Sequence, residues 1–72
     1  MEELKKGQIV IVRLEKMRNS KLECEFVCHD NEHNELLIFK PIRIVENNVS
    51  MWMLECVTRC LITATAKQIV SM

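Results

Sequence analysis

The chain of 72 residues contains only one glycine, one proline and no tyrosine, and its ten basic residues balance ten acidic ones. With so few glycines and prolines, turns are expected at Asn, Asp, Ser and charged clusters. A net charge of zero argues against a protein that holds nucleic acid by bulk charge alone. No apolar run approaches the roughly 20 residues that span a bilayer, and the first residues lack a signal-peptide pattern. We therefore expect a cytoplasmic protein without a membrane segment.

Alternation of apolar and polar residues predicts a single, mostly β domain over residues 1–72. The predicted strands are residues 8–15, 21–29, 35–46, 49–63 and 67–72. Residues 1–7 predict a short helical turn that ends at Gly7. Pro41 predicts a bulge, an edge or a bend within the third strand. Five short strands with tight connections favour a small barrel, a strongly bent antiparallel sheet preceded by a short N-terminal helix.

Two of these strands carry the apolar side chains that decide what is buried. In the second, Leu22, Cys24, Phe26 and Cys28 share one face, which is typical of a half-buried antiparallel strand. The fourth is apolar on both faces, so we expect it to be buried on both or paired in an assembly. The three aromatic residues, Phe26, Phe39 and Trp52, are expected in the core or in an interface.

The four cysteines form two Cys-x3-Cys pairs, Cys24 with Cys28 and Cys56 with Cys60. Along a strand, four residues span about 13 Å, too far for one pair to chelate a metal ion. We expect four free, buried thiols, with structural zinc, a disulfide or redox use as the alternatives. No catalytic motif is present, although a Cys–His nucleophile pair stays open. The prediction is a protein that is not an enzyme and has neither metal nor cofactor.

Residues 24–39, CEFVCHDNEHNELLIF, resemble the first motif of the Sm-like family (Sm, Lsm and Hfq proteins), in which D-x-x-x-N joins two strands. Residues 64–72, ATAKQIVSM, are similar to the second motif. The chain departs from the family at Cys24, where a glycine is usual. It also departs at Thr65-Ala66, which replace Arg-Gly, and at Glu32, which occupies a position that commonly stacks on a base.

The resemblance implies an Sm-like barrel that forms a homo-oligomeric ring by pairing the fourth strand of one subunit with the fifth of the next. It also implies binding of single-stranded RNA through loops 30–34 and 64–67. The candidate RNA-binding residues are Asp30, Glu32, His33, Asn34, Thr65 and Lys67. The neutral charge, Glu32 and the missing Arg favour an alternative, a structural or protein-interaction ring without RNA binding.

Two further observations bear on the RNA-binding prediction. Asp30 and Asn34 satisfy backbone groups in tight turns, so both have a purely structural interpretation. Convergence of five basic side chains on one face of the molecule would favour RNA binding. These five are Lys5, Lys6, Lys16, Arg18 and Lys67.

Overall fold

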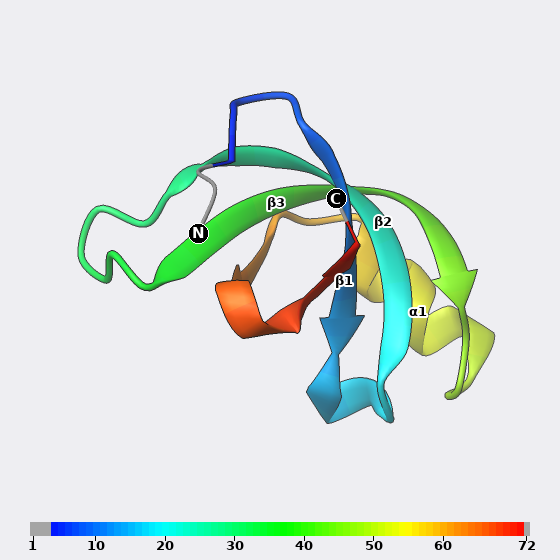
Figure 1. The fold of residues 1–72 in the computed structure, drawn as a ribbon. Coiled ribbons are helices and arrows are strands. Elements are labelled where there is room, and N and C mark those ends of the chain that lie inside the picture. The colour runs from blue at the N-terminus through cyan, green and yellow to red at the C-terminus, as the bar shows by residue number, and fades with distance from the viewer. Residues whose placement is uncertain (1–3, 72) are drawn as a thin grey trace.

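A five-stranded antiparallel sheet, curled into a half-barrel, forms the protein in the computed structural model, which describes residues 4–71 (Figure 1). The strands lie in the order β4-β3-β2-β1-β5. Their bounds are β1 Ile9–Leu14, β2 Ser20–His29, β3 Leu36–Glu46, β4 Ile62–Thr65 and β5 Ile69–Ser71, with helix α1 at Met51–Thr58 and 3-10 turns η1 Glu15–Met17 and η2 Ala66–Gln68. The mostly β, five-stranded prediction is confirmed. This curled sheet is compatible with an Sm-like fold and does not by itself identify one.

The core lies inside the curl of the sheet and follows the predicted alternation of β2. Leu22 and Cys24 are fully buried and Phe26 is nearly so. Facing strands and the helix complete the cluster with Val10, Val12, Leu37, Phe39, Leu54 and Ala64. The rings of Phe26 and Phe39 pack edge to face, 5.8 Å between centroids. Both phenylalanines therefore lie in the core, as the sequence predicts.

β-Bulges accompany the bending of the sheet in a chain that has no glycine in its strands. The pairing of β2 with β3 shifts register three times, leaving Val27, Ile42 and Val45 as extra residues. Each bulge bends its strand and increases the local twist. Cys24, where the Sm-like pattern has glycine, stays in the core and pairs with Pro41 beside one such shift. The bend expected around Pro41 is thus present as a bulge.

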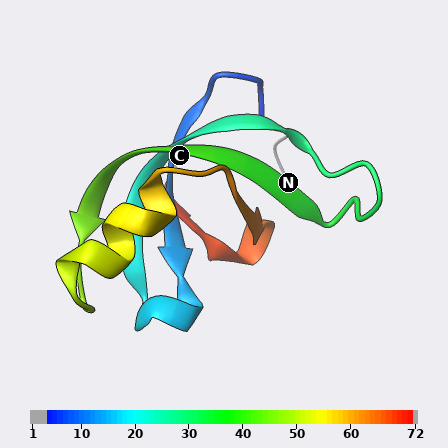
Figure 2. The same ribbon diagram turned by 180° about the vertical axis from the view of Figure 1, so that it is seen from behind.

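The predicted fourth strand over residues 49–63 is wrong, because this segment forms α1 and only then β4. Leu54 is the buried residue of α1, and Val57 and Thr58 are half-buried. These positions follow helical spacing of three and four residues, with methionine, leucine and glutamate as good helix formers. The apolar residues of the other face are exposed, so two-sided apolarity here does not signal a doubly buried strand. Figure 2 shows α1 beside the bent half of β3.

The helix of this fold is internal, between β3 and β4, and not N-terminal as predicted. Residues 5–8 form a turn closed by the Gln8 amide, which donates to the Lys5 carbonyl at 2.9 Å. Gly7 has φ of +87°, a backbone conformation that residues other than glycine rarely adopt. Residues 1–3 and 72, which belong to the predicted first turn and last strand, lie outside the described residues. Lys67 belongs to η2, so the last strand begins later than predicted.

Candidate functional site

The loop between β2 and β3 is organised by Asp30. Its Oδ1 accepts hydrogen bonds from the backbone amides of Glu32, at 2.8 Å, and His33, at 3.1 Å. These two amides hold the pKa of the Asp30 carboxyl below its ordinary value of 3.8. The Leu36 amide donates to the His33 carbonyl and closes the loop. Asp30 therefore stabilises the turn, the structural role that its position in the sequence suggests.

The remaining candidates of this loop, Glu32, His33 and Asn34, have exposed side chains. Nδ1 of His33 lies 3.9 Å from Oε1 of Glu35, and both side chains are more than half exposed. The Asn34 amide forms no side-chain hydrogen bond with any residue of the described range 4–71. Asp30, Glu32 and Glu35 make the loop acidic, which disfavours a close approach of phosphate. Asn34 is thus the candidate most available for a ligand.

Thr65 and Lys67, the candidates at the other end of the chain, belong to the turn between β4 and β5. The Thr65 amide donates to Oε1 of Gln68 at 3.0 Å, and Nε2 of Gln68 donates to the Arg13 carbonyl at 3.0 Å. Thr65 and Gln68 form a capping box around η2, which engages the Thr65 side chain within the turn. Lys67 is exposed. Gln68 ties this turn to β1, a structural role that the similarity of residues 64–72 to the second Sm motif did not indicate.

The sheet brings the two candidate loops to the same end of β3. Leu36, which follows the acidic loop, pairs with Thr65, which precedes η2. Residues 30–35 and η2 are therefore neighbours in space although they are far apart in sequence. No hydrogen bond or ion pair joins the two loops within residues 4–71. The arrangement places the candidate residues near one another without binding them into one network.

The basic residues named above do not converge on one end of the molecule. Lys5 and Lys6 precede β1, whereas Lys16 and Arg18 follow it. A strand of six residues separates the two pairs by about 20 Å. Lys67 lies in η2, which contacts β1. This distribution does not support phosphate binding by a single cluster of these five side chains.

All four cysteines are free, as predicted, but only Cys24 is buried. Burial, with a smaller contribution from Glu23, raises the pKa of the Cys24 thiol to about 12. Cys28 is exposed because the bulge at Val27 takes it off the core face. Cys56 is exposed on α1, and Cys60 in the connection that follows it. In the part of the chain that the structure describes, no group of three or more His, Cys, Asp or Glu residues is arranged to hold a metal ion.

Two sheet edges are uncovered in the described chain. β4 pairs only with β3, and β5 pairs only with β1. Large apolar side chains are exposed near these edges, with Leu61 59% and Val70 51% accessible. Trp52 is 69% exposed on α1, so it does not belong to the core. No helix among residues 4–71 is long and apolar enough to cross a membrane.

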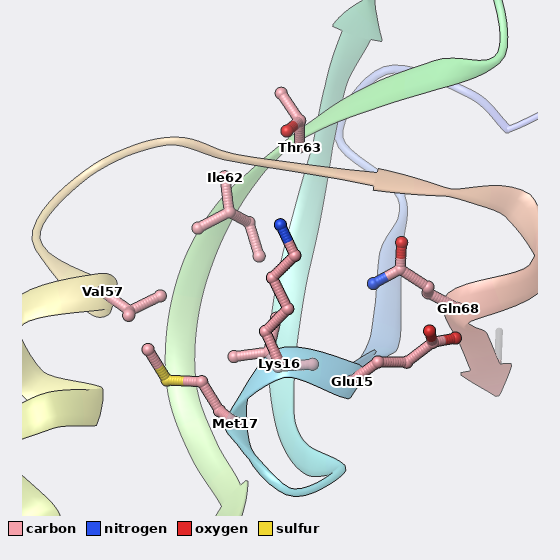
Figure 3. Close-up of a pocket in the computed structure, with 8 residues that line it drawn as sticks. Glu15, Lys16, Met17, Val57, Ile62, Thr63 and Gln68 are labelled. Atoms are coloured by element: carbon pink, nitrogen blue, oxygen red, sulfur yellow. The ribbon is translucent and has the colours of Figure 1, made fainter.

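A pocket of about 340 Å³ opens between η1, the end of α1, β4 and η2 (Figure 3). Its lining residues are Leu14, Glu15, Lys16, Met17, Val57, Ile62, Thr63 and Gln68. Sequence reasoning did not find this site, because its lining residues come from short pieces of five elements, β1, η1, α1, β4 and η2, most of which are distant from one another along the chain. One of those elements, α1, was also predicted as a strand. No local motif marks these residues.

Comparison with known proteins adds no relative: no family model matches the chain, and neither a curated protein nor a solved structure does so.

Proposed function

We propose that the protein is an assembly module whose copies join through the free edges of β4 and β5. The position of these two strands at opposite edges of one sheet is the observation that carries the proposal. An uncovered edge presents unpaired backbone N–H and C=O groups that pair readily with another strand. Pairing β4 of one copy with β5 of the next would satisfy both edges at once.

The side chains along these edges support the same proposal. β4 and β5 contain no proline and no lysine, the residues that commonly protect an edge from pairing. Exposed Leu61 and Val70 would lose water contact when the edges meet. A head-to-tail contact of this kind repeats from copy to copy and closes into a ring if its rotation permits. A domain of 72 residues also gains stability from such an assembly, because its own core is small.

Light scattering coupled to size exclusion at micromolar concentration tests the proposal. We expect an oligomer for the parent chain and a smaller species for Val70→Lys, since a charge on β5 opposes edge pairing. Ile42→Lys is the matched control, because Ile42 is 50% exposed, close to the 51% of Val70, but lies on β3. A monodisperse monomer of 8.5 kDa for the parent chain would overturn the proposal. So would equal dissociation of both variants.

Binding of single-stranded RNA is the second candidate function. The pairing of Leu36 with Thr65 favours it, because the two loops that the Sm-like resemblance assigns to RNA are neighbours. The exposed Asn34 amide would read a base edge, and Lys67 would approach a phosphate. In an oligomer, several such weak sites would act together through effective concentration. The acidic loop residues and the absence of the Arg-Gly pair weigh against this function.

Fluorescence polarisation with labelled oligo-U and oligo-A at two salt concentrations tests RNA binding. If Asn34 reads a base, Asn34→Ala should weaken binding by about 1–3 kcal/mol, by analogy with base readout in DNA. Asn31→Ala is the matched control, since Asn31 is an exposed asparagine of the same loop. Absence of binding to either oligonucleotide would remove this function. Equal affinity in all three proteins would remove Asn34 from the site.

A further inference from the structure

The pocket between η1, α1, β4 and η2 combines an apolar wall with one lysine. Its apolar side chains come from different elements: Leu14, Met17, Val57 and Ile62. Figure 3 shows the Lys16 side chain extending across the opening, with its ammonium group toward Ile62 and Thr63. At about 340 Å³ the pocket lies near the lower end of the range of small-molecule sites, about 300–1,000 Å³. Its size therefore suits a small ligand.

The charged and polar groups around the pocket are not equally available to a ligand. The Glu15 carboxylate pairs with Arg13, Oε1 to Nη2 at 3.4 Å. The Gln68 amide is engaged by Thr65 and by the Arg13 carbonyl. Lys16 forms no ion pair with any residue between positions 4 and 71. The pocket thus offers one uncompensated positive charge beside an apolar surface.

We propose that this pocket binds a small amphipathic carboxylate, a molecule with a short aliphatic chain and one carboxylate group. The chain would contact Leu14, Met17, Val57 and Ile62. The carboxylate would accept a charge-assisted hydrogen bond from Nζ of Lys16. Thr63 supplies a hydroxyl from β4 as a second donor on the same side of the pocket. This site includes Ile62 and Thr63 of β4, the strand whose free edge we propose for assembly, but the binding of a ligand here does not require that assembly.

A ligand without the anionic group fits this environment less well. An apolar molecule over the pocket would remove water from the Lys16 ammonium group without replacing its hydrogen bonds. A carboxylate without the chain would leave the apolar wall exposed. The combination of both parts in one ligand is therefore what the lining selects.

Titration of the ¹⁵N-labelled full chain with octanoate, followed by two-dimensional amide spectra, tests the site. We expect saturable shifts in residues of η1, β4 and η2, and weaker binding of 1-octanol and of acetate. Lys16→Met should reduce octanoate affinity about tenfold, since hydrogen bonds to charged groups are strong. Lys6→Met is the control, because Lys6 is also exposed but precedes β1, whereas Lys16 follows it.

A variant that is expected to increase the affinity for octanoate makes the test sharper. Glu15→Gln removes the anionic group at the pocket and should tighten octanoate binding, by less than Lys16→Met weakens it, because Arg13 already offsets Glu15. Lys16→Arg should retain most of the affinity. Shifts that do not saturate, equal octanoate affinity in parent and Lys16→Met, or 1-octanol binding as tight as octanoate would each overturn the proposal. Shifts centred on Trp52 and the exposed face of α1 would overturn it as well.

Discussion

Ser20 offers a sharp test of how the turn after β1 is held to the end of β3, because its small side chain is fully buried and makes two hydrogen bonds. Its hydroxyl donates to the Met17 carbonyl at 2.7 Å and accepts from the backbone amide of Asn48 at 2.9 Å. It therefore links the turn after β1 to the chain that leaves β3, 28 residues away. Ser20→Ala removes the hydroxyl and leaves both backbone groups without this partner.

The expected cost follows from what happens to those two groups. An unsatisfied buried donor or acceptor costs about 1–3 kcal/mol. Asn48 itself is exposed, so water can replace part of the loss at its amide. We expect Ser20→Ala to lower the free energy of unfolding by about 2 kcal/mol. In a domain of this size that corresponds to about 8–16 °C in melting temperature.

Far-UV circular dichroism during urea and thermal unfolding is the appropriate assay, because Trp52 is too exposed to be a sensitive reporter of the core. Ser50→Ala is the matched control. Ser50 occupies the N-cap position of α1 but makes no side-chain capping hydrogen bond, so its loss should cost less than 0.5 kcal/mol, the usual range of about ±0.5 for surface changes. If Ser20→Ala unfolds within 0.5 kcal/mol of the parent chain, or Ser50→Ala costs as much, the reasoning is refuted.

Three further predictions concern the helix, the acidic loop and the thiols. Leu54→Ala should cost about 2–5 kcal/mol in urea unfolding because Leu54 anchors α1 in the core, whereas Met53→Ala, at an exposed position, should cost far less. Asp30→Ala should shift the amide resonances of its loop, whereas Asp30→Asn, which keeps an acceptor oxygen, should shift them less. Because the pKa of Asp30 is lowered on folding, its contribution is complete above the ordinary value of 3.8 and is lost as pH falls through the lower folded value, so both hydrogen bonds to its carboxylate should persist from pH 5 to 8 and weaken only in stronger acid. A thiol reagent at neutral pH should modify Cys28, Cys56 and Cys60 in the native protein and Cys24 only after unfolding; rapid native labelling of Cys24 would contradict its burial.

The strands that the sequence predicts well are those in which one face is buried and the other is exposed to solvent. β1, β2 and the start of β3 show period-two alternation, and the buried residues Leu22, Cys24 and Phe26 follow it. Such a pattern depends only on local spacing, so it is legible without the tertiary structure. The Asp30 turn is legible for a similar reason, because its hydrogen bonds reach only two and three residues ahead.

The errors arise where tertiary context decides. Residues 51–58 expose Met51, Trp52 and Met53, and these apolar positions obscure the helical spacing of Leu54 and Val57. Unlike the bulge beside Pro41, the bulge at Val27 has no marker in the sequence, so the outward turn of Cys28 was not predictable from alternation alone. The pocket lining depends on the helix formed by residues 51–58 and on contacts between turns that are distant along the chain. The pocket is thus harder to predict from the sequence than the core.

The bulges also connect the curvature of the sheet with the proposed assembly. β3 pairs with β4 only from Leu36 to Phe39. Beyond Phe39, the extra residues Ile42 and Val45 accompany the bend of β3, and α1 packs beside that bent half. The helix occupies the part of the chain that would otherwise extend β4, so β4 is only four residues long. A short edge strand limits unspecific pairing, while its position opposite β5 leaves a defined place for a neighbouring copy. On this reasoning, the bulges of β3 accompany the curl of the subunit, and the helix that follows β3 limits the edge through which we propose that it assembles.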